Sequence, residues 1–134
     1  ITGPNLTVPL FSIVLRKGYG LRVMAMVGGH SQAPFFTLSW PTGEFGGMGL
    51  EGAVKLGYRK EMEAIADLAE RQRWYEQRVA ESYENGKAIN TAMGFDFDEV
   101  IDPAETRAHI VAGLESIPAP VRAGKKKRPF IDSW

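Results

Sequence analysis

The sequence predicts an α/β fold in which helices cover parallel strands. Three consecutive segments support this prediction: an apolar run at residues 8–15, an apolar segment at residues 21–27 behind a glycine turn, and a strand-like run at residues 35–40. The first run is short and nearly continuous, which is typical of a strand buried on both faces. The order strand, helix, strand indicates a parallel βαβ unit.

Each of these three elements follows from its local pattern. Residues 8–15 show no polar alternation, so we expect a fully buried strand. Residues 21–27 are too rich in apolar side chains for an exposed helix and stop at Gly28-Gly29, so we expect a buried helix. Aromatic and branched residues fill positions 35–40, and Pro41 with the turn residues behind it closes this second strand.

The second half of the chain is predicted to be mainly helical. Residues 50–58 indicate a short, packed helix, and residues 61–92 consist largely of strong helix formers. The apolar face of this amphipathic helix is expected at Leu68, Tyr75, Val79 and Ser82 or Tyr83. Asn85-Gly86 is expected to break it, and residues 95–101 indicate a final short strand.

A last helix is predicted to begin at Asp102. Asp as N-cap, Pro103 at the first helical position and Glu105 at the third are strong start signals. Its apolar face is expected at Ile110, Val111, Leu114 and Ile117, before Pro118 ends the helix. We therefore assign residues 1–117 to one domain and residues 118–134 to an extended C-terminal tail.

Composition excludes several classes of function. A chain of 134 residues suits one domain, and sixteen Lys plus Arg against sixteen Asp plus Glu disfavour a dedicated nucleic-acid binder. Without cysteine there is no disulfide, thiolate zinc site or cysteine nucleophile. No apolar run reaches membrane-spanning length, so we expect a soluble, cytoplasmic protein with no membrane partner. The chain begins with Ile1 and no signal peptide, which favours a cut-down chain.

Side-chain catalysis finds little support. His30 and His109 lack metal-ligand spacing, so we expect no metal site, and Ser12 and Ser39 lack the glycine context of a hydrolase nucleophile. Glu44 stands beside glycines and is a candidate base or carbamate-contacting acid. A turn carboxylate that faces solvent is the simpler alternative.

Glycine instead indicates a site built from backbone. Fifteen residues are glycine, and they concentrate at residues 18–29 and 43–52. After Gly18-Tyr19-Gly20, the amides of Gly20, Leu21 and Arg22 are candidate donors to a developing oxyanion, and a common strand-to-helix turn is the alternative.

A second glycine cluster, Gly46-Gly47-Met48-Gly49, is a candidate of the same kind, with tight strand–helix packing as the alternative. Neither cluster matches a P-loop or a dinucleotide-binding fingerprint. The basic run at residues 125–128 is either a solvated tail or a phosphate clamp.

The order and spacing of several strings resemble one protein family. The strings lie at residues 15–21, 33–36, 40–54, 58–61, 98–107 and 127–132. They resemble the C-terminal portion of the carboxyltransferase (beta) subunits of biotin-dependent acyl-CoA carboxylases, the acetyl-CoA and propionyl-CoA carboxylase group. The resemblance implies a partial crotonase-like domain, built as a spiral of ββα units.

The resemblance also implies a reaction. Carboxybiotin, carried on a separate domain or subunit, gives its carboxyl group to the α-carbon of an acyl-CoA, and backbone oxyanion holes stabilise the enolates. Two alternatives stay open, namely a non-catalytic assembly fragment and a related acyl-CoA decarboxylase. We expect no carboxyl transfer from these 134 residues alone.

Site residues follow from the same resemblance. The amides of Leu21 and Arg22 correspond to the biotin-side oxyanion hole, and Tyr19, Gly20, Met24, Gly46 and Gly47 correspond to the walls around the cofactor. Arg22 replaces a small residue of the relatives and is expected to affect biotin access or substrate choice. Met24 replaces a polar or acidic residue associated with acyl selectivity.

The implied partners are other parts of a carboxylase. They are the upstream CoA-binding half of the same subunit, identical subunits in a homo-oligomer, biotin carboxylase and the biotin carrier subunit.

Overall fold

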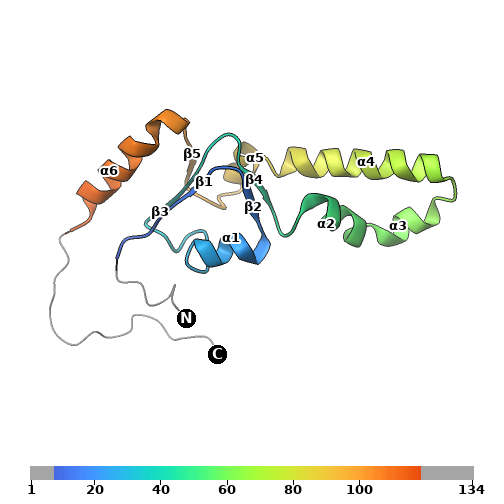
Figure 1. Cartoon of the computed structure of the whole chain (residues 1–134), viewed down its shortest axis with the longest axis horizontal. Helices are drawn as coiled ribbons and strands as arrows, with labels where there is room; N and C mark the ends of the chain where they lie inside the picture. The colour runs from blue at the N-terminus through green and yellow to red at the C-terminus, as the bar shows by residue number, and fades with distance from the viewer. Residues whose placement is uncertain (1–7, 119–134) are drawn as a thin grey trace, which may run out of the picture.

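The computed structural model describes residues 8–118, so the predicted tail at residues 118–134 lies outside them apart from Pro118. The predicted α/β fold is confirmed, with the order strand, strand, helix occurring twice. The elements are β1 (Phe11–Val14), β2 (Lys17–Tyr19) and α1 (Gly20–Met26), then β3 (Phe36–Ser39), β4 (Glu44–Gly46) and α2 (Leu50–Gly57) (Figure 1).

Equivalent strands of the two units pair in parallel. β1 pairs with β3 from Phe11 opposite Phe36 to Val14 opposite Ser39, and β2 pairs with β4. β5 (Glu99–Val100) adds a third parallel strand beside β3, so β1 lies at the edge of this sheet. The strands expected at residues 8–15 and 35–40 are therefore confirmed, while the strand expected at residues 95–101 shrinks to two residues.

The local pattern missed β2 and β4. Each strand has three residues and contains a glycine, and sequence reasoning assigned both segments to turns. Their pairing with each other stabilises them, and this long-range contact leaves no periodic signal in so short a segment.

The core lies between the two sheets and the helices that follow them. Its buried apolar residues are Val14, Val27, Leu38, Leu50, Val54, Ala88, Phe97 and Ile101. The Phe45 and Phe97 rings stack with centroids 4.8 Å apart. Ser39 is fully buried, and its Oγ lies 2.9 Å from the Trp40 carbonyl oxygen and 3.2 Å from that of Val14. Its single hydroxyl hydrogen therefore has an acceptor in the core.

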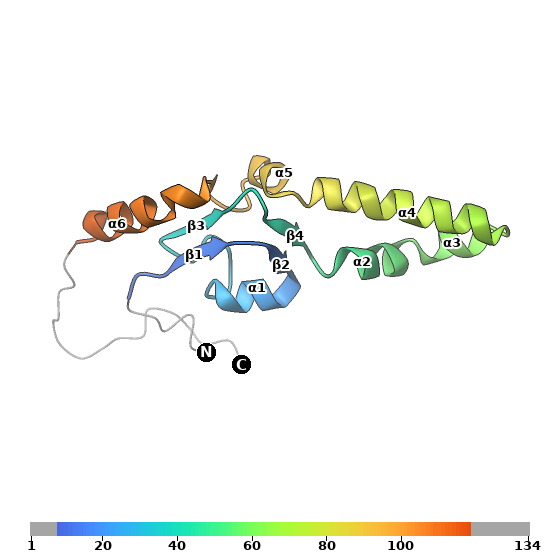
Figure 2. The same cartoon turned by 45° about the horizontal axis from the view of Figure 1, so that its top comes forward.

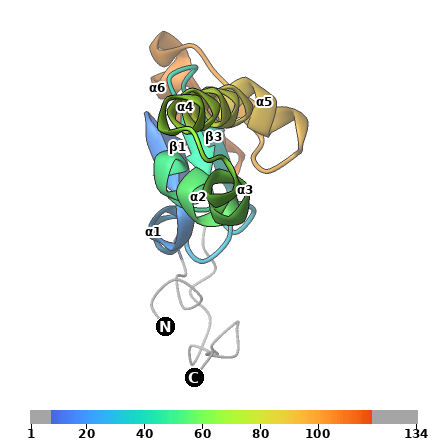
Figure 3. The same ribbon diagram turned by 90° about the vertical axis from the view of Figure 1, so that its right-hand side faces the viewer.

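A helical arm, residues 50–85, extends to one side of the sheets. It consists of α2, α3 (Arg59–Ala64) and α4 (Leu68–Asn85), and the view along it shows α4 above α2 and α3 (Figures 1 and 3). The expected break at Gly86 is confirmed, since α5 (Ala88–Met93) follows it. The continuous helix predicted from residue 61 is wrong, because Asp67 caps a new helix by accepting from the Glu70 amide at 2.8 Å.

The helix α1 is more exposed than predicted. α1 has no buried residue and exposes 87% of Leu21 and 80% of Met26, so the expected buried helix is wrong for this chain. The end of α1 is fixed by Val27, which is buried behind it.

The predicted start of the last helix is confirmed. Asp102 accepts from the Ala104 amide, the 3₁₀ helix η2 (Pro103–Glu105) follows, and α6 (Thr106–Ser116) continues it. The buried contact of α6 is Gly113, which lies against the rings of Phe11 and Phe36.

The apolar face predicted for α6 is therefore only partly right, because Val111 and Leu114 are exposed. Figure 2 shows α6 and α1 on opposite sides of β1. None of the helices in residues 8–118 is both long and apolar enough to cross a membrane.

Candidate functional site

The two glycine clusters meet where β2 leads into α1 and β4 leads into α2. Tyr19 lies opposite Gly46 in the strand register. Gly20 has a φ of +58°, and a Cβ added to it would lie 2.6 Å from the carbonyl oxygen of Gly47. Only glycine fits there, so two segments some distance apart in the sequence form one backbone site.

The first amides of α1 are available to a ligand. Tyr19 is the N-cap residue, and within residues 8–118 no side chain caps the helix. The first N–H groups of an α-helix have no partner inside the helix. The amides of Leu21 and Arg22, predicted as oxyanion donors, therefore retain their hydrogen-bonding capacity.

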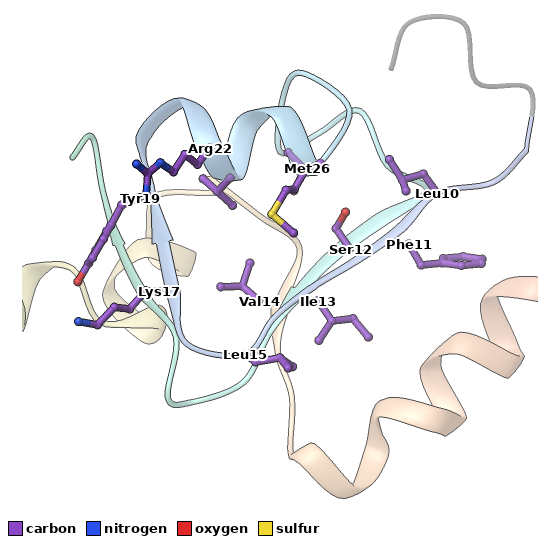
Figure 4. Close-up of a pocket in the computed structure, with 12 residues that line it drawn as sticks. Leu10, Phe11, Ser12, Ile13, Val14, Leu15, Lys17, Tyr19, Arg22 and Met26 are labelled. Atoms are coloured by element: carbon purple, nitrogen blue, oxygen red, sulfur yellow. The ribbon is translucent and has the colours of Figure 1, made fainter. Parts of the chain in front are cut away.

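Two open grooves flank α1. The glycine groove, about 740 Å³, brings together five of the seven predicted residues: Gly20, Leu21, Met24, Gly46 and Gly47. The β1 groove, about 610 Å³, lies between α1 and β1 and contains the other two, Tyr19 and Arg22 (Figure 4). The predicted residues are thus neighbours, but α1 divides them between two faces.

Arg22 lies where its side chain does not narrow the glycine groove. Its side chain is exposed and lines the β1 groove, near Tyr19 (Figure 4). Of the two predicted donor residues, Leu21 lines the glycine groove and Arg22 lines the β1 groove. Substitutions that keep or remove the Arg22 amide can separate its contribution from that of the side chain.

A side-chain hydrogen bond joins Tyr19, the residue before Gly20, to Glu44. The Tyr19 hydroxyl donates to Glu44 Oε2 at 2.8 Å. Burial and this hydrogen bond raise the pKa of Tyr19 above its ordinary value, so the hydroxyl stays protonated at neutral pH. Glu44 is half-buried rather than fully solvent-facing, and it lines neither groove.

Sequence reasoning missed one wall of the glycine groove, which is formed by the residue after α4, by α5 and by the segment that follows α5. Gly86, Thr91, Asp96 and Phe97 line this wall. A Cβ on Gly86 would lie 2.5 Å from the carbonyl oxygen of Phe45. The helix break at Asn85-Gly86 was visible in the sequence, but its contact with β4 was not.

The histidines and serines do not assemble a catalytic or metal centre. His30 lines the glycine groove but is exposed, and its Nδ1 accepts from the Gln32 amide at 3.1 Å. Ser12 and Ser39 are buried in the sheet. Among residues 8–118, no three His, Asp or Glu side chains are arranged to hold a metal ion.

Five glycines line the glycine groove: Gly18, Gly20, Gly46, Gly47 and Gly86. Gly18 and Gly86 are buried against Phe45, so they serve the packing of the groove wall. A Cβ added to Gly47 would meet no atom within 4 Å, so the backbone is open to a ligand at this position.

Comparison with known proteins gives consistent matches. Residues 4–130 match the Carboxyl transferase domain. The propionyl-CoA carboxylase carboxyltransferase subunit of Haloferax mediterranei is 34% identical over 92% of this chain and 22% of that protein.

Two solved structures match in fold and sequence. One, a single-chain, multi-domain long-chain acyl-CoA carboxylase, has a TM-score of 0.68 and 55% identity, over 82% of this chain and 10% of that chain. The other is transcarboxylase 12S, solved as a hexamer with methylmalonyl-CoA bound. It has a TM-score of 0.74 and 30% identity, over 91% of this chain and 24% of that chain.

These matches explain the repeated strand, strand, helix order. The chain spans about a fifth of the curated relatives it matches. It has the crotonase-like fold in partial form, as the resemblance implied. The chain belongs to the carboxyl transferase domain family, in which it corresponds to a C-terminal portion.

Proposed function

We propose that this chain is the biotin-side part of an acyl-CoA carboxyltransferase subunit, which moves a carboxyl group from carboxybiotin to the α-carbon of an acyl-CoA. The observation that carries the proposal is the close approach of Gly20 to the Gly47 carbonyl, which joins both glycine clusters at one open groove. Membership of the family supports the reaction class.

In this proposal the protein acts through its backbone. The amides of Leu21 and Arg22 donate to a carbonyl oxygen on which negative charge develops during transfer. Gly20, Gly46 and Gly47 allow the ring of biotin to approach these donors, while Tyr19 and Met24 line the two faces of α1 beside them. When bound, carboxybiotin supplies the carboxyl group, and a separate domain or subunit carries it.

A long acyl chain is the substrate class we propose. The 55% identity to a long-chain acyl-CoA carboxylase supports it. Met24 contributes an apolar side chain to the glycine groove where the resemblance implies a polar or acidic one. Assay of the complete subunit with acyl-CoA thioesters of increasing chain length tests this, and a preference for acetyl-CoA or propionyl-CoA would contradict it.

The proposed partners supply what this chain lacks. The upstream half of the same subunit would bind CoA, identical subunits would complete a homo-oligomer, and biotin carboxylase with the biotin carrier would deliver the carboxyl group. The hexamer of transcarboxylase 12S and the multi-domain architecture of the long-chain carboxylase support such an assembly.

The test compares the complete subunit with this chain alone. Each is incubated with carboxylated biotin carrier and a range of acyl-CoA thioesters, and the carboxylated product is measured by mass spectrometry. We expect product from the complete subunit and none from the chain. Absence of product from a folded complete subunit would refute carboxyl transfer. Transfer of the carboxyl group in the reverse direction, from a carboxylated acyl-CoA to the biotin carrier, with no product in the forward direction, would favour the decarboxylase alternative.

A further inference from the structure

Glu44 is held at the start of β4 by three contacts. Its amide donates to the Arg16 carbonyl oxygen at 2.7 Å, and its backbone forms an antiparallel bridge with Lys87. Its Oε2 accepts from the Tyr19 hydroxyl. Glu44 itself lines neither groove, but its hydrogen-bond partner Tyr19 lines the β1 groove.

Tyr19 links Glu44 to the backbone that forms the site. It is the residue before Gly20, and its extended main chain begins α1. Its ring lies beside Gly46, since a Cβ on Gly46 would be 3.7 Å from Tyr19 Cδ1. The Tyr19 side chain thus connects the residue that precedes α1 with Glu44 in β4. Figure 4 shows Tyr19 and Arg22 close together at the start of α1.

We infer that Glu44 is a positioning residue. By accepting a hydrogen bond from the Tyr19 hydroxyl, Glu44 fixes Tyr19 and thereby holds the peptides of residues 20–22 in place beside Gly47. This inference rests on the proposed function for its effect on catalysis, although the positioning itself is measurable without any reaction. A base at Glu44 is disfavoured, because its carboxylate reaches neither groove and already accepts a hydrogen bond.

The state of the hydroxyl supports this role. The pKa of Tyr19 is raised by burial first and by the Glu44 hydrogen bond second, so Tyr19 remains a donor through the neutral range. A permanent donor paired with a carboxylate gives a charge-assisted hydrogen bond, which is stronger and more directional than a neutral one.

A matched control exists on the helical arm. The Tyr83 hydroxyl donates to the Glu51 carboxylate, so Tyr83→Phe deletes the same kind of hydrogen bond. Tyr83 lies on α4 and lines neither groove. Tyr19→Phe at the site and Tyr83→Phe in the control both keep the aromatic ring, so we expect both variants to fold.

The experiment uses the complete subunit and two readouts. In Tyr19→Phe and Glu44→Ala, we expect faster hydrogen exchange of the peptide that contains residues 20–22, while Tyr83→Phe leaves this exchange unchanged. Both site variants should lower kcat about ten-fold with little change in KM, a smaller loss than the roughly 10²-fold that a 1 Å misplacement can cause. Glu44→Gln, which keeps an acceptor, should restore most of the rate.

A double variant separates positioning from general structure. If Glu44 acts through Tyr19, Tyr19→Phe combined with Glu44→Ala should lose no more activity than either alone. Multiplied losses, or equal losses in Glu44→Gln and Glu44→Ala, would overturn the inference. So would unchanged exchange at residues 20–22, whatever the activity. A wild-type subunit that transfers no carboxyl group would instead refute the proposed function, while the exchange result would still decide the positioning role.

Discussion

The glycine site and the helical arm are held together by different kinds of contact. At the site, backbone meets backbone, as at Gly20 and the Gly47 carbonyl. In the arm, side chains meet, as where the Arg78 guanidinium lies 5.1 Å from the Trp74 ring centroid and 5.8 Å from that of Tyr58. We therefore expect the site to be sensitive to changes in N–H groups and Cβ atoms, and the arm to tolerate loss of single side-chain contacts.

The surfaces of the two regions differ as well. α1 exposes the apolar side chains Leu21 and Met26 beside the open grooves. The arm exposes many charged side chains, some of them in ion pairs along α3 and α4, together with the apolar side chains of Leu56 and Leu68. An exposed apolar helix next to an edge strand is typical of a surface that another polypeptide covers.

The largest expected effect comes from deleting one backbone donor of the site. Arg22→Pro removes the amide and should lower carboxyl transfer by the complete subunit about 10²- to 10³-fold, the usual cost of losing one oxyanion donor. Arg22→Gly keeps the amide and should raise the rate or leave it unchanged, because the side chain lines only the β1 groove. Steady-state kcat measures both.

Folding of each Arg22 variant is checked by thermal unfolding. Proline is tolerated in the first turn of a helix, where the N–H has no helical partner. Unimpaired turnover by a folded Arg22→Pro subunit would place the oxyanion hole elsewhere and would remove the contrast between backbone and side chain.

The next effect concerns the apolar surface beside α1. We expect the 134-residue chain to self-associate at micromolar concentration, because Met26 and Leu15 expose apolar surface around an edge strand. Met26→Glu should shift it toward monomer, whereas Leu68→Glu, at the start of α4 in the arm, should not. Sedimentation of the unmodified chain as a 14.8 kDa monomer would contradict this expectation.

Paired glycine substitutions compare the arm with a third region, the contact of α6 with the sheet. A Cβ on Gly113 in α6 would lie 2.8 Å from Phe36 Cε1 and 2.9 Å from Phe11 Cε1. Gly113→Ala should therefore cost about 1–3 kcal/mol by overpacking. Gly57→Ala, at the end of α2 with no atom within 4 Å of the new Cβ, should cost nothing. Denaturant unfolding measures both, and equal midpoints would contradict the packing of α6.

How much was predictable from the sequence depends on whether a feature is local. The strand at Phe11–Val14 and the cap at Asp102 were predictable, because each rests on neighbouring residues. The full burial expected for that strand is wrong, because only Ser12 and Val14 are buried and Val8 and Leu15 are exposed. β2 was not predictable, because its three residues are stabilised by β4, far along the chain. The exposure of α1 was also missed, because a high proportion of apolar residues is typical both of a buried helix and of a helix that another polypeptide covers.

The site shows the same limit. The two glycine clusters could be located from the sequence, because glycine density marks positions where the backbone needs unusual conformations or close approach. The role of the Leu21 and Arg22 amides as donors stays a prediction. The sequence could not predict that Tyr19 and Met24 line different grooves on the two sides of α1, because this depends on how α1 lies against β1. The positioning role that we propose for Glu44 could not be inferred from the sequence, because it depends on the hydrogen bond between Glu44 and Tyr19.

The smallest expected effects lie in the arm and sharpen the comparison there. Arg59 and Glu63 form an exposed ion pair at 2.9 Å, with 75% and 62% of their side chains accessible. Water and salt screen such a pair, so Glu63→Gln should change the free energy of unfolding by less than about 0.5 kcal/mol.

The N-cap of α4 gives the matching comparison within the arm. Asp67→Ala removes this N-cap and should lower the free energy of unfolding by about 1 kcal/mol, because a helix amide loses its acceptor. In high salt the effect of Glu63→Gln should vanish while that of Asp67→Ala persists in part, since a hydrogen bond is screened less than a surface charge pair. Denaturant unfolding at low and high NaCl measures both, and a larger loss in Glu63→Gln than in Asp67→Ala would show that ion pairs, rather than backbone capping, stabilise the arm.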